Sequence, residues 1–261
     1  MRLKDQLNNE VSLESVPRRI ISLVPSLTEL LCDLGLAGQI VGVTKFCVHP
    51  ENIRQKSTVI GGTKKVHLDE CMALKPDFVL ASKEENIEHQ VNFFQEKGIV
   101  VYTSDIKVFD DLKDLVNDLG QIFQIESKAQ RLSSTIDDHL KQLKNFQLKK
   151  DISATYLIWK DPYMAAGGDT FISHMLAMTG IDNALAHEKR YPTVSVETLK
   201  EKSGDVILLS SEPFPFKASH VEEIAGLTGK KVILVDGEFF SWYGSRILHM
   251  KDYLKQLTSQ L

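Results

Sequence analysis

The sequence of 261 residues is poor in cysteine: its three thiols, Cys32, Cys47 and Cys71, form no CxxC pair. An odd number without paired spacing argues against a disulfide framework, so we expect reduced thiols. No apolar run is long enough to span a bilayer. The sequence also has no excess of basic residues, because its formal net charge is −4. A general nucleic-acid-binding surface would need a basic face and is therefore not expected.

Two familiar kinds of motif are missing as well. Gly61-Gly62 predicts a tight turn before a helix, but the Gly-Lys-Ser/Thr order of a nucleotide P-loop is absent. The first nineteen residues hold no apolar core for a signal peptide. The next stretch lacks the small residue that a lipoprotein cleavage site needs, since Leu31 occupies that place. The sequence as written carries no export signal, which leaves a cytoplasmic location open.

What the sequence does contain is the composition of an ordinary globular protein, with 43% hydrophobic and 25% charged residues. Its longest regular pattern lies in the middle of the chain. Between residues 126 and 150, apolar side chains recur every three or four positions, and neither proline nor glycine interrupts them. This period predicts one amphipathic helix.

The order of elements before this helix is repeated after it. Each half reads strand, glycine-closed helix, helix with an acidic turn and strand, then a final strand. In the first half these segments are residues 20–24, 26–35, 74–81 and 98–105; in the second they are 155–159, 170–180, 202–209 and 229–238. We predict an α/β fold of two lobes with mostly parallel sheets, 1–125 and 151–261, joined by one long linking helix, 126–150.

Single acids also correspond between the halves. Asp69 lies eight residues before Asp77, and Glu197 lies eight before Asp205. Near the N-terminus, residues 5–17 predict a small hairpin with its turn at Asn8-Asn9. After the apolar strand 20–24, we expect Ser26 to cap the next helix, with Glu29 at its third position.

Cys47 and His49 follow a predicted strand over residues 39–46, in a loop. With one residue between them, the two side chains of an extended loop can meet one metal ion. The alternative is a buried thiol beside a histidine that caps the next helix. The pair is not completed by a second pair nearby, which supports the alternative. Its position after a strand keeps a ligand role open, because ligands of open α/β sheets bind at the carboxyl ends of strands.

Three loops of the second half are rich in aromatic side chains. Each follows a predicted strand and has no strand of its own in which its rings could pack. We therefore expect an exposed apolar patch that binds a ligand. The predicted ligand-binding residues are Tyr163, Phe214, Phe216, Phe239, Phe240, Trp242, Tyr243 and Arg246.

Taken together, these segments resemble the helical-backbone substrate-binding proteins of ABC importers for cobalamin, haem and iron chelates, with the cobalamin-binding members nearest. The resemblance covers nearly the whole chain, and LKPD after an acid-bearing helix is its most specific piece. Residues 17–36, 41–46, 98–105, 191–199 and 245–248 also carry it. It implies two rigid lobes joined by a single helix, a ligand in the cleft between them, and a family that works outside the cytoplasm.

The resemblance implies roles for particular residues. It places the acids that dock on arginines of a permease dimer at Asp69 and Glu197. It places an aromatic ring that flanks the corrin near Phe239 or Phe240. The chain departs from the cobalamin pattern at residues 59–65, where VIGGTKK replaces a tryptophan-bearing stretch, and the segment 47–49 is no part of that pattern.

The leading prediction is a monomeric, non-enzymatic receptor without a covalent cofactor. It would hold a corrinoid, or an iron or other metal chelate, for an ABC permease. In this prediction Trp242, Tyr243 and Phe214 stack on the ligand, and Arg246 pairs with its carboxylate or phosphate.

Two alternatives stay open. One is an intracellular metal or corrinoid carrier that has no permease. The other is an enzyme in the same cleft, with Cys47 as nucleophile and His49 as base.

Overall fold

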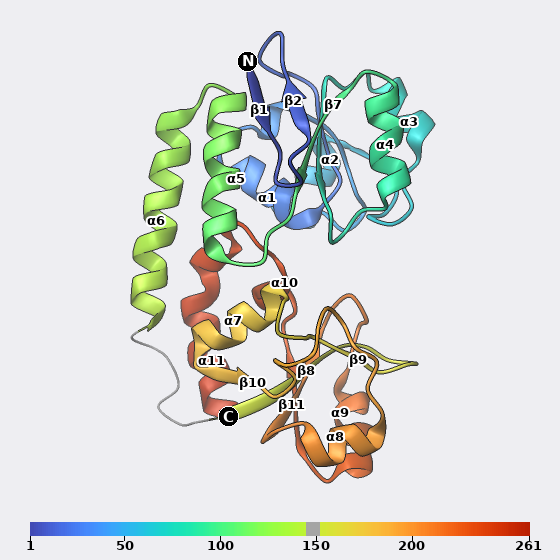
Figure 1. Cartoon of the computed structure of the whole chain (residues 1–261), viewed down its shortest axis with the longest axis vertical. Helices are drawn as coiled ribbons and strands as arrows, with labels where there is room; N and C mark the ends of the chain where they lie inside the picture. The colour runs from blue at the N-terminus through green and yellow to red at the C-terminus, as the bar shows by residue number, and fades with distance from the viewer. Residues whose placement is uncertain (145–151) are drawn as a thin grey trace. The chain divides into compact units, whose positions relative to one another are not determined.

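The computed structural model describes residues 1–144 and 152–261, which form two compact units (Figure 1). The N-terminal unit comprises Met1–Ile136 and Tyr243–Arg246, and the C-terminal unit comprises Asp137–Trp242 and Ile247–Leu261. The division falls inside helix α6 (Glu126–Lys144), so residues 126–144 are helical, as the sequence pattern indicates, and their linking role stays a prediction. Its remaining predicted residues, 145–150, lie outside the described residues, and the predicted lobe limits stay a prediction.

The N-terminal unit is built on a parallel sheet with the strand order β5-β4-β3-β6-β7. The predicted apolar runs fill its centre: β3 and β6 are buried throughout, as expected for strands covered on both faces. The chain leaves β3 toward one edge of the sheet and β6 toward the other, so a topological switch point lies between them. The strands are β3 (Ile20–Ser22), β4 (Ile40–Val43), β5 (Thr58–Val59), β6 (Phe78–Ser82) and β7 (Val100–Ser104).

An N-terminal hairpin is present, with Asn8 at a φ of 66° in its turn, but it does not have the predicted bounds of 5–17. Its antiparallel strands are β1 (Arg2–Lys4) and β2 (Glu10–Ser12). The predicted cap of the first helix is wrong. Helix α1 (Pro25–Asp33) begins one residue earlier, with Pro25 in its first turn and Val24 as the cap. Proline suits that position because it lacks only an N–H that would have no helical partner.

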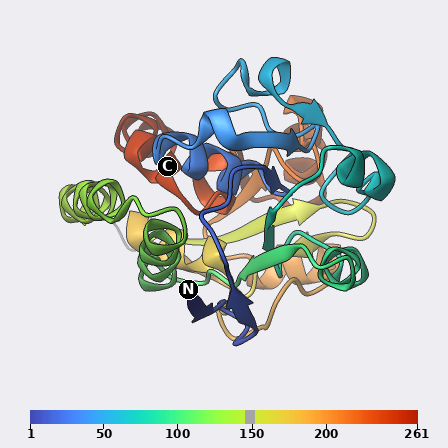
Figure 2. The ribbon, with the colours of Figure 1, turned by 90° about the horizontal axis from the view of Figure 1, so that it is seen from above.

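The other helices of this unit connect the strands. They are η1 (Ala37–Gln39), α2 (Ile53–Lys56), α3 (Leu68–Ala73), α4 (Glu88–Glu96) and α5 (Phe109–Ile122). Helices α5 and α6 run side by side (Figures 1 and 2). A Cβ on Gly120 of α5 would lie 2.7 Å from that of Ala129 on α6, so glycine is what permits this close approach.

The C-terminal unit contains a second sheet, in the order β10-β8-β11-β12, with these four strands parallel and β9 antiparallel to β8. The fold class predicted from the sequence, α/β with mostly parallel sheets, is confirmed. Its core includes Leu157, Ile207, Leu209 and Ile224. The strands are β8 (Ile152–Trp159), β9 (Met164–Ala165), β10 (Ile181–Asn183), β11 (Val206–Ser210) and β12 (Lys231–Val235).

The predicted glycine-closed helix of this unit is α7 (Phe171–Thr179), with Gly180 at a φ of 80° after it. Thr170 caps its start, where its hydroxyl accepts the Ser173 N–H at 3.2 Å. The other helices are α8 (Val196–Lys202), α9 (Ala218–Thr228), α10 (Glu238–Ser241), η2 (Ser245–His249) and α11 (Met250–Gln260). Among residues 1–144 and 152–261, no helix combines the length and apolar character that crossing a bilayer requires.

Candidate functional site

The predicted site residues lie mainly in segments that follow the carboxyl ends of the strands. Cys47 and His49 follow β4, and Asp69 follows β5. The predicted ligand-binding residues follow β8, β11 and β12 in the chain. Ligands of open α/β sheets bind at such edges, beside the switch point. We describe the edge of each unit separately.

Asn86 holds the edge of the N-terminal unit together. Its buried side chain accepts the Ser82 N–H at 2.9 Å and donates to the carbonyls of Leu23 at 3.3 Å and Thr63 at 3.1 Å. These three partners lie beyond or at the ends of β6, β3 and β5. One amide thus fixes three loops, which gives the edge a defined shape.

Cys47 is fully buried in the loop after β4. Its sulfur lies 3.1 Å from the Thr28 hydroxyl and 3.4 Å from the Thr44 hydroxyl. Burial raises the pKa of this thiol, the opposite of what an activated nucleophile needs. All three cysteines are free, as predicted.

His49, two residues further on, is half-buried. In the part of the chain that the structure describes, no three His, Cys, Asp or Glu side chains gather to form a metal site. A site made by the protein alone is therefore not seen there. The predicted contact of Cys47 or His49 with the metal of a bound chelate stays a prediction.

Phe46, beside Cys47, is the most exposed ring of this edge. It is 49% exposed, with the Lys45 ammonium 5.0 Å from the ring centre. The Gly62 backbone approaches it so closely that a Cβ there would lie 3.2 Å from the ring. The sequence analysis did not include Phe46 among the candidate ligand-binding residues. A large apolar residue just beyond the carboxyl end of a strand was the available signal.

A charged rim lies beyond β6 and β7. The Lys83 ammonium is 2.8 Å, and the Lys107 ammonium 3.4 Å, from the same carboxylate oxygen of Asp105. Burial opposes ionisation of Asp105, but these two cations outweigh it and lower its pKa. Burial raises the pKa of Glu85, which follows β6. The rim therefore offers both cationic and anionic groups.

Arg246 and Tyr243, two predicted ligand contacts, belong to the N-terminal unit and bond to it. The Arg246 guanidinium forms an ion pair with Glu29 of α1, with nitrogen and oxygen 2.8 Å apart. Burial outweighs this partner and raises the pKa of Glu29. The Tyr243 hydroxyl donates to the Ser82 hydroxyl at 2.5 Å. Both side chains thus hold the segment Tyr243–Arg246 in place.

Trp159 is the exposed ring of the C-terminal unit's edge. It ends β8, is 40% exposed, and packs edge-on against Phe214 with 5.7 Å between ring centres. The ring centres of Phe214 and Phe216 are 4.7 Å apart, and Phe216 is 3% exposed and belongs to the core. Tyr163 is half-buried against the same core. The sequence pattern places Trp159 at the end of a strand, and it was not among the candidate ligand-binding residues.

The rings that follow β12 are largely enclosed. Phe240 is fully buried, and its ring centre lies 5.2 Å from that of Tyr156. Phe239 stacks on Tyr253 with 4.4 Å between ring centres. The Trp242 indole N–H donates to the Glu212 carboxylate at 2.7 Å.

The predicted exposed patch is therefore wrong for Phe216, Phe240, Trp242 and Tyr243, each 8% exposed or less. The physical reason is that these loops fold back onto their unit, where core packing and hydrogen bonds to the indole and phenol groups satisfy the rings. Whether any of the predicted residues contacts a ligand stays a prediction.

The two predicted docking acids occupy equivalent places. Asp69 is the second residue of α3, Glu197 is the second residue of α8, and both are exposed. The Glu197 carboxylate accepts its own backbone N–H and the Ser195 hydroxyl, which lowers its pKa. Acids in the first turn of a helix are favoured by the helix dipole.

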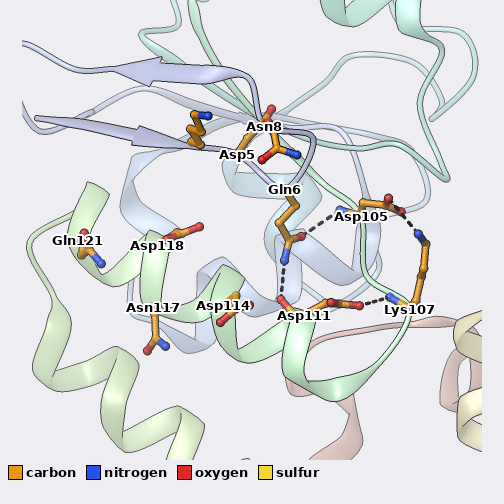
Figure 3. A pocket seen from close by; sticks show the side chains of 11 residues that line it. Asp5, Gln6, Asn8, Asp105, Lys107, Asp111, Asp114, Asn117, Asp118 and Gln121 are labelled. Atoms are coloured by element: carbon orange, nitrogen blue, oxygen red, sulfur yellow. Dashed lines mark hydrogen bonds and ion pairs between the residues drawn. The ribbon is translucent and has the colours of Figure 1, made fainter.

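One polar hollow of about 630 Å³ opens between the β1–β2 turn and α5 in the N-terminal unit (Figure 3). Gln6 spans it, donating to the Asp111 carbonyl at 2.6 Å and accepting the Asp105 N–H at 2.9 Å. Carboxylates, amides and two lysines line it, without any of the predicted ligand-binding residues. Its lining does not suit a broad apolar ligand.

Comparison with known proteins places the chain in a family. Residues 20–231 match the periplasmic binding protein family. An uncharacterised ABC transporter substrate-binding lipoprotein of Bacillus subtilis, YvrC, is 27% identical over 94% of this chain and 81% of its own. The vitamin B12-binding protein of Yersinia pestis is 26% identical over 77% and 73% of the two chains.

A solved structure shows the same fold. The periplasmic haem-binding protein of Pseudomonas aeruginosa superposes with a TM-score of 0.82 at 19% identity, over 93% of this chain and 92% of that one. The fold, the matched residues and these relatives agree with the resemblance seen in the sequence. The chain belongs to the periplasmic binding protein family of ABC transporter substrate-binding proteins.

Proposed function

We propose that this protein binds a corrinoid or a similar metal chelate, without transforming it, and delivers it to an ABC importer. The vitamin B12-binding relative supports a corrinoid. The haem-binding protein of the same fold makes haem the second ligand to test. The buried Cys47 thiol, with its raised pKa, does not favour the enzymatic alternative.

Exposed rings at the two sheet edges carry this proposal. Phe46 in the N-terminal unit and Trp159 in the C-terminal unit are the two aromatic side chains among the exposed large hydrophobic residues of the described chain. Each follows or ends a strand at the edge where ligands of such sheets bind. A broad, flat ligand buries apolar area on such rings, which contributes about 25 cal/mol per Å².

The polar groups nearby suit the rest of such a ligand. Lys83 and Lys107 can pair with ligand carboxylates or phosphates, since both ammonium groups are about half exposed. Of the two predicted metal contacts, we favour His49, because its side chain is half-buried whereas Cys47 is fully buried.

Asp69 and Glu197 are the two residues that we connect with an importer. Both acids are exposed on short helices, one in each unit, and the resemblance assigns them to arginines of the permease. We propose that these two carboxylates dock the loaded protein. An intracellular carrier without a permease would need neither.

Titration of the purified full chain with cyanocobalamin and with haemin, followed by absorption spectra, tests ligand binding. We expect one of the two to bind with a dissociation constant of about 1 μM or below, equivalent to about −8 kcal/mol. If neither spectrum changes at a tenfold higher concentration, the proposed ligand class is wrong.

Uptake of the same two compounds by cells whose chromosomal copy carries Asp69→Lys or Glu197→Lys tests docking. We expect each charge reversal to reduce uptake while the purified variant still binds its ligand. Asp138→Lys, at an exposed position of α6, is the matched control. Normal uptake by both docking variants would favour the carrier without a permease.

A further inference from the structure

We propose that Asp77 and Asp205 are positioning residues that hold the docking helices α3 and α8 against their sheets. This inference rests on the proposed docking function and deepens it, because it names residues that act through Asp69 and Glu197 rather than on the permease. In each unit the positioning acid lies eight residues after the docking acid. The spacing places it just beyond the end of the docking helix.

In the N-terminal unit, Asp77 joins the exit of α3 to the start of β3. Its carboxylate accepts the backbone N–H groups of Arg18 at 2.9 Å and Arg19 at 2.8 Å. In return, the Arg19 guanidinium donates to the carbonyls of Leu74, at 2.6 and 2.8 Å, and Lys75, at 3.1 Å. These two carbonyls directly follow α3, where a helix leaves acceptors unpaired.

The C-terminal unit repeats this arrangement with different residues. The Asp205 carboxylate accepts both the backbone N–H and the hydroxyl of Ser153, each at 2.8 Å. Ser153 is the second residue of β8. Its two hydrogen bonds lower the pKa of Asp205. The Lys230 ammonium donates to the Gly204 carbonyl at 3.0 Å, in the role that Arg19 has in the other unit.

Strand pairing does not require these side chains. β3 pairs with β6, and β8 with β11, through their backbones. The turns themselves differ, because Lys75 takes a φ of 48° before a proline and Gly204 takes a φ of 74°. The two units share two features. A carboxylate accepts backbone N–H groups at the start of a central strand, and a cationic side chain donates to a carbonyl that follows the docking helix.

The docking helices need such attachments because they are short. α3 has six residues and α8 has seven. Isolated helices of this length are unstable in water, so their position depends on tertiary contacts. Without these attachments a docking helix would occupy several positions, and its acid would be placed correctly for the permease in only a fraction of the molecules. The apparent affinity for the permease would fall by that fraction.

Hydrogen exchange of the purified full chain tests the clamp itself. Asp77→Asn should speed exchange of α3 amides about tenfold and leave α8 unchanged, and Asp205→Asn should do the reverse, since local opening sets exchange. Asp111→Asn is the matched control: its carboxylate accepts the N–H groups of Lys107 and Val108, at 2.8 and 3.0 Å, before α5. Unchanged exchange in the docking helices, or a uniform rise, would overturn the proposal.

Uptake of cyanocobalamin and haemin by cells tests the link to docking. Asp77→Asn should lower uptake about fivefold or more and change ligand affinity less than twofold, whereas Asp138→Asn, at an exposed position of α6, should leave uptake unchanged. In an Asp69→Asn background, Asp77→Asn should add no further loss, because coupled residues are not additive.

The outcomes separate this inference from the proposed function. If Asp69→Asn leaves uptake unchanged, the docking function fails and this inference fails with it. If Asp69→Asn lowers uptake but Asp77→Asn does not, or if the two losses simply add, only this inference fails.

Discussion

The Arg246 guanidinium and the Glu29 carboxylate form a buried ion pair within the N-terminal unit, with Nη2 2.8 Å from Oε1 and Nε 3.0 Å from Oε2. The two side chains belong to residues that are 9% and 8% exposed. The pair joins α1 to the returning segment Tyr243–Arg246. The protein's own carboxylate thus engages the arginine that the sequence analysis assigned to a ligand anion.

Arg246→Ala should lower the free energy of unfolding by about 3–5 kcal/mol, because it leaves the Glu29 carboxylate buried without its cation. Replacing both partners, in Glu29→Gln with Arg246→Met, should recover most of this loss, since neither charge then remains. Urea unfolding measured for Arg246→Ala and for the double variant checks this. A double variant as unstable as Arg246→Ala would contradict it.

Truncation of the exposed rings should weaken ligand binding. Phe46→Ala and Trp159→Ala should each raise the dissociation constant for the bound chelate about tenfold, equivalent to about 1.4 kcal/mol, because each removes apolar contact area. Titration followed by absorption spectra measures the change.

An exposed apolar side chain elsewhere provides a control for these variants. Leu227→Ala in α9 removes a similarly exposed apolar group, 43% exposed. Its affinity should match that of the wild type. An equal loss in ring and control variants would show that the rings have no special part in binding.

Two glycine substitutions in helices should have opposite effects. Gly120→Ala should destabilise the protein by about 1–3 kcal/mol, because its Cβ would lie 2.7 Å from that of Ala129. Gly226→Ala in α9 meets no atom within 4 Å and should stabilise by about 1 kcal/mol through helix propensity. Thermal unfolding compares the two, and a shift in the same direction for both would contradict the close approach of α5 and α6.

Stability should fall in mild acid through His139 on α6. Burial, with Lys251 and His249 nearby, lowers its pKa below the ordinary 6.5, and Asp252 opposes them only in part. At a pH between the lowered and the ordinary pKa, the unfolded chain binds more protons at this site than the folded protein does. The free energy of unfolding is therefore not reduced by His139 above about pH 6.5, and it falls as the pH drops below that value.

His139→Gln is the variant that isolates this site. It should reduce the difference in unfolding free energy between about pH 5.5 and about pH 7.5, measured in urea. The matched control is His187→Gln at an exposed position. An unchanged difference in His139→Gln would assign the acid sensitivity to other groups.

Local sequence signals predicted the elements well. The three-to-four-residue period of residues 126–144 predicted a helix, and the structure has one there. That spacing gathers Ala129, Ile136 and Leu140 on one buried face of the helix. Gly35 and Gly180 end their helices at positive φ, where other residues are strained. These features depend on near neighbours in the chain and can be predicted without knowing the fold.

The same reasoning failed for the aromatic loops. It counted rings near strand ends but had no means to predict that Phe216 and Phe240 pack into the core or that Glu212 receives the Trp242 indole. Phe46 and Trp159 carried no motif, yet the structure exposes both. Exposure of a ring depends on what the rest of the chain places over it.

The sequence by itself determined the α/β architecture, its duplication and its family, because these follow from hydrophobic period, turn residues and motifs that lie close together in the chain. Only the tertiary structure decided which side chains are available to a ligand. Glu29 and Arg246 lie 217 positions apart in the sequence, and Arg18 and Asp77 lie 59 positions apart. Such contacts form when folding brings distant segments together, and burial then decides whether a polar group serves the fold or remains free to bind.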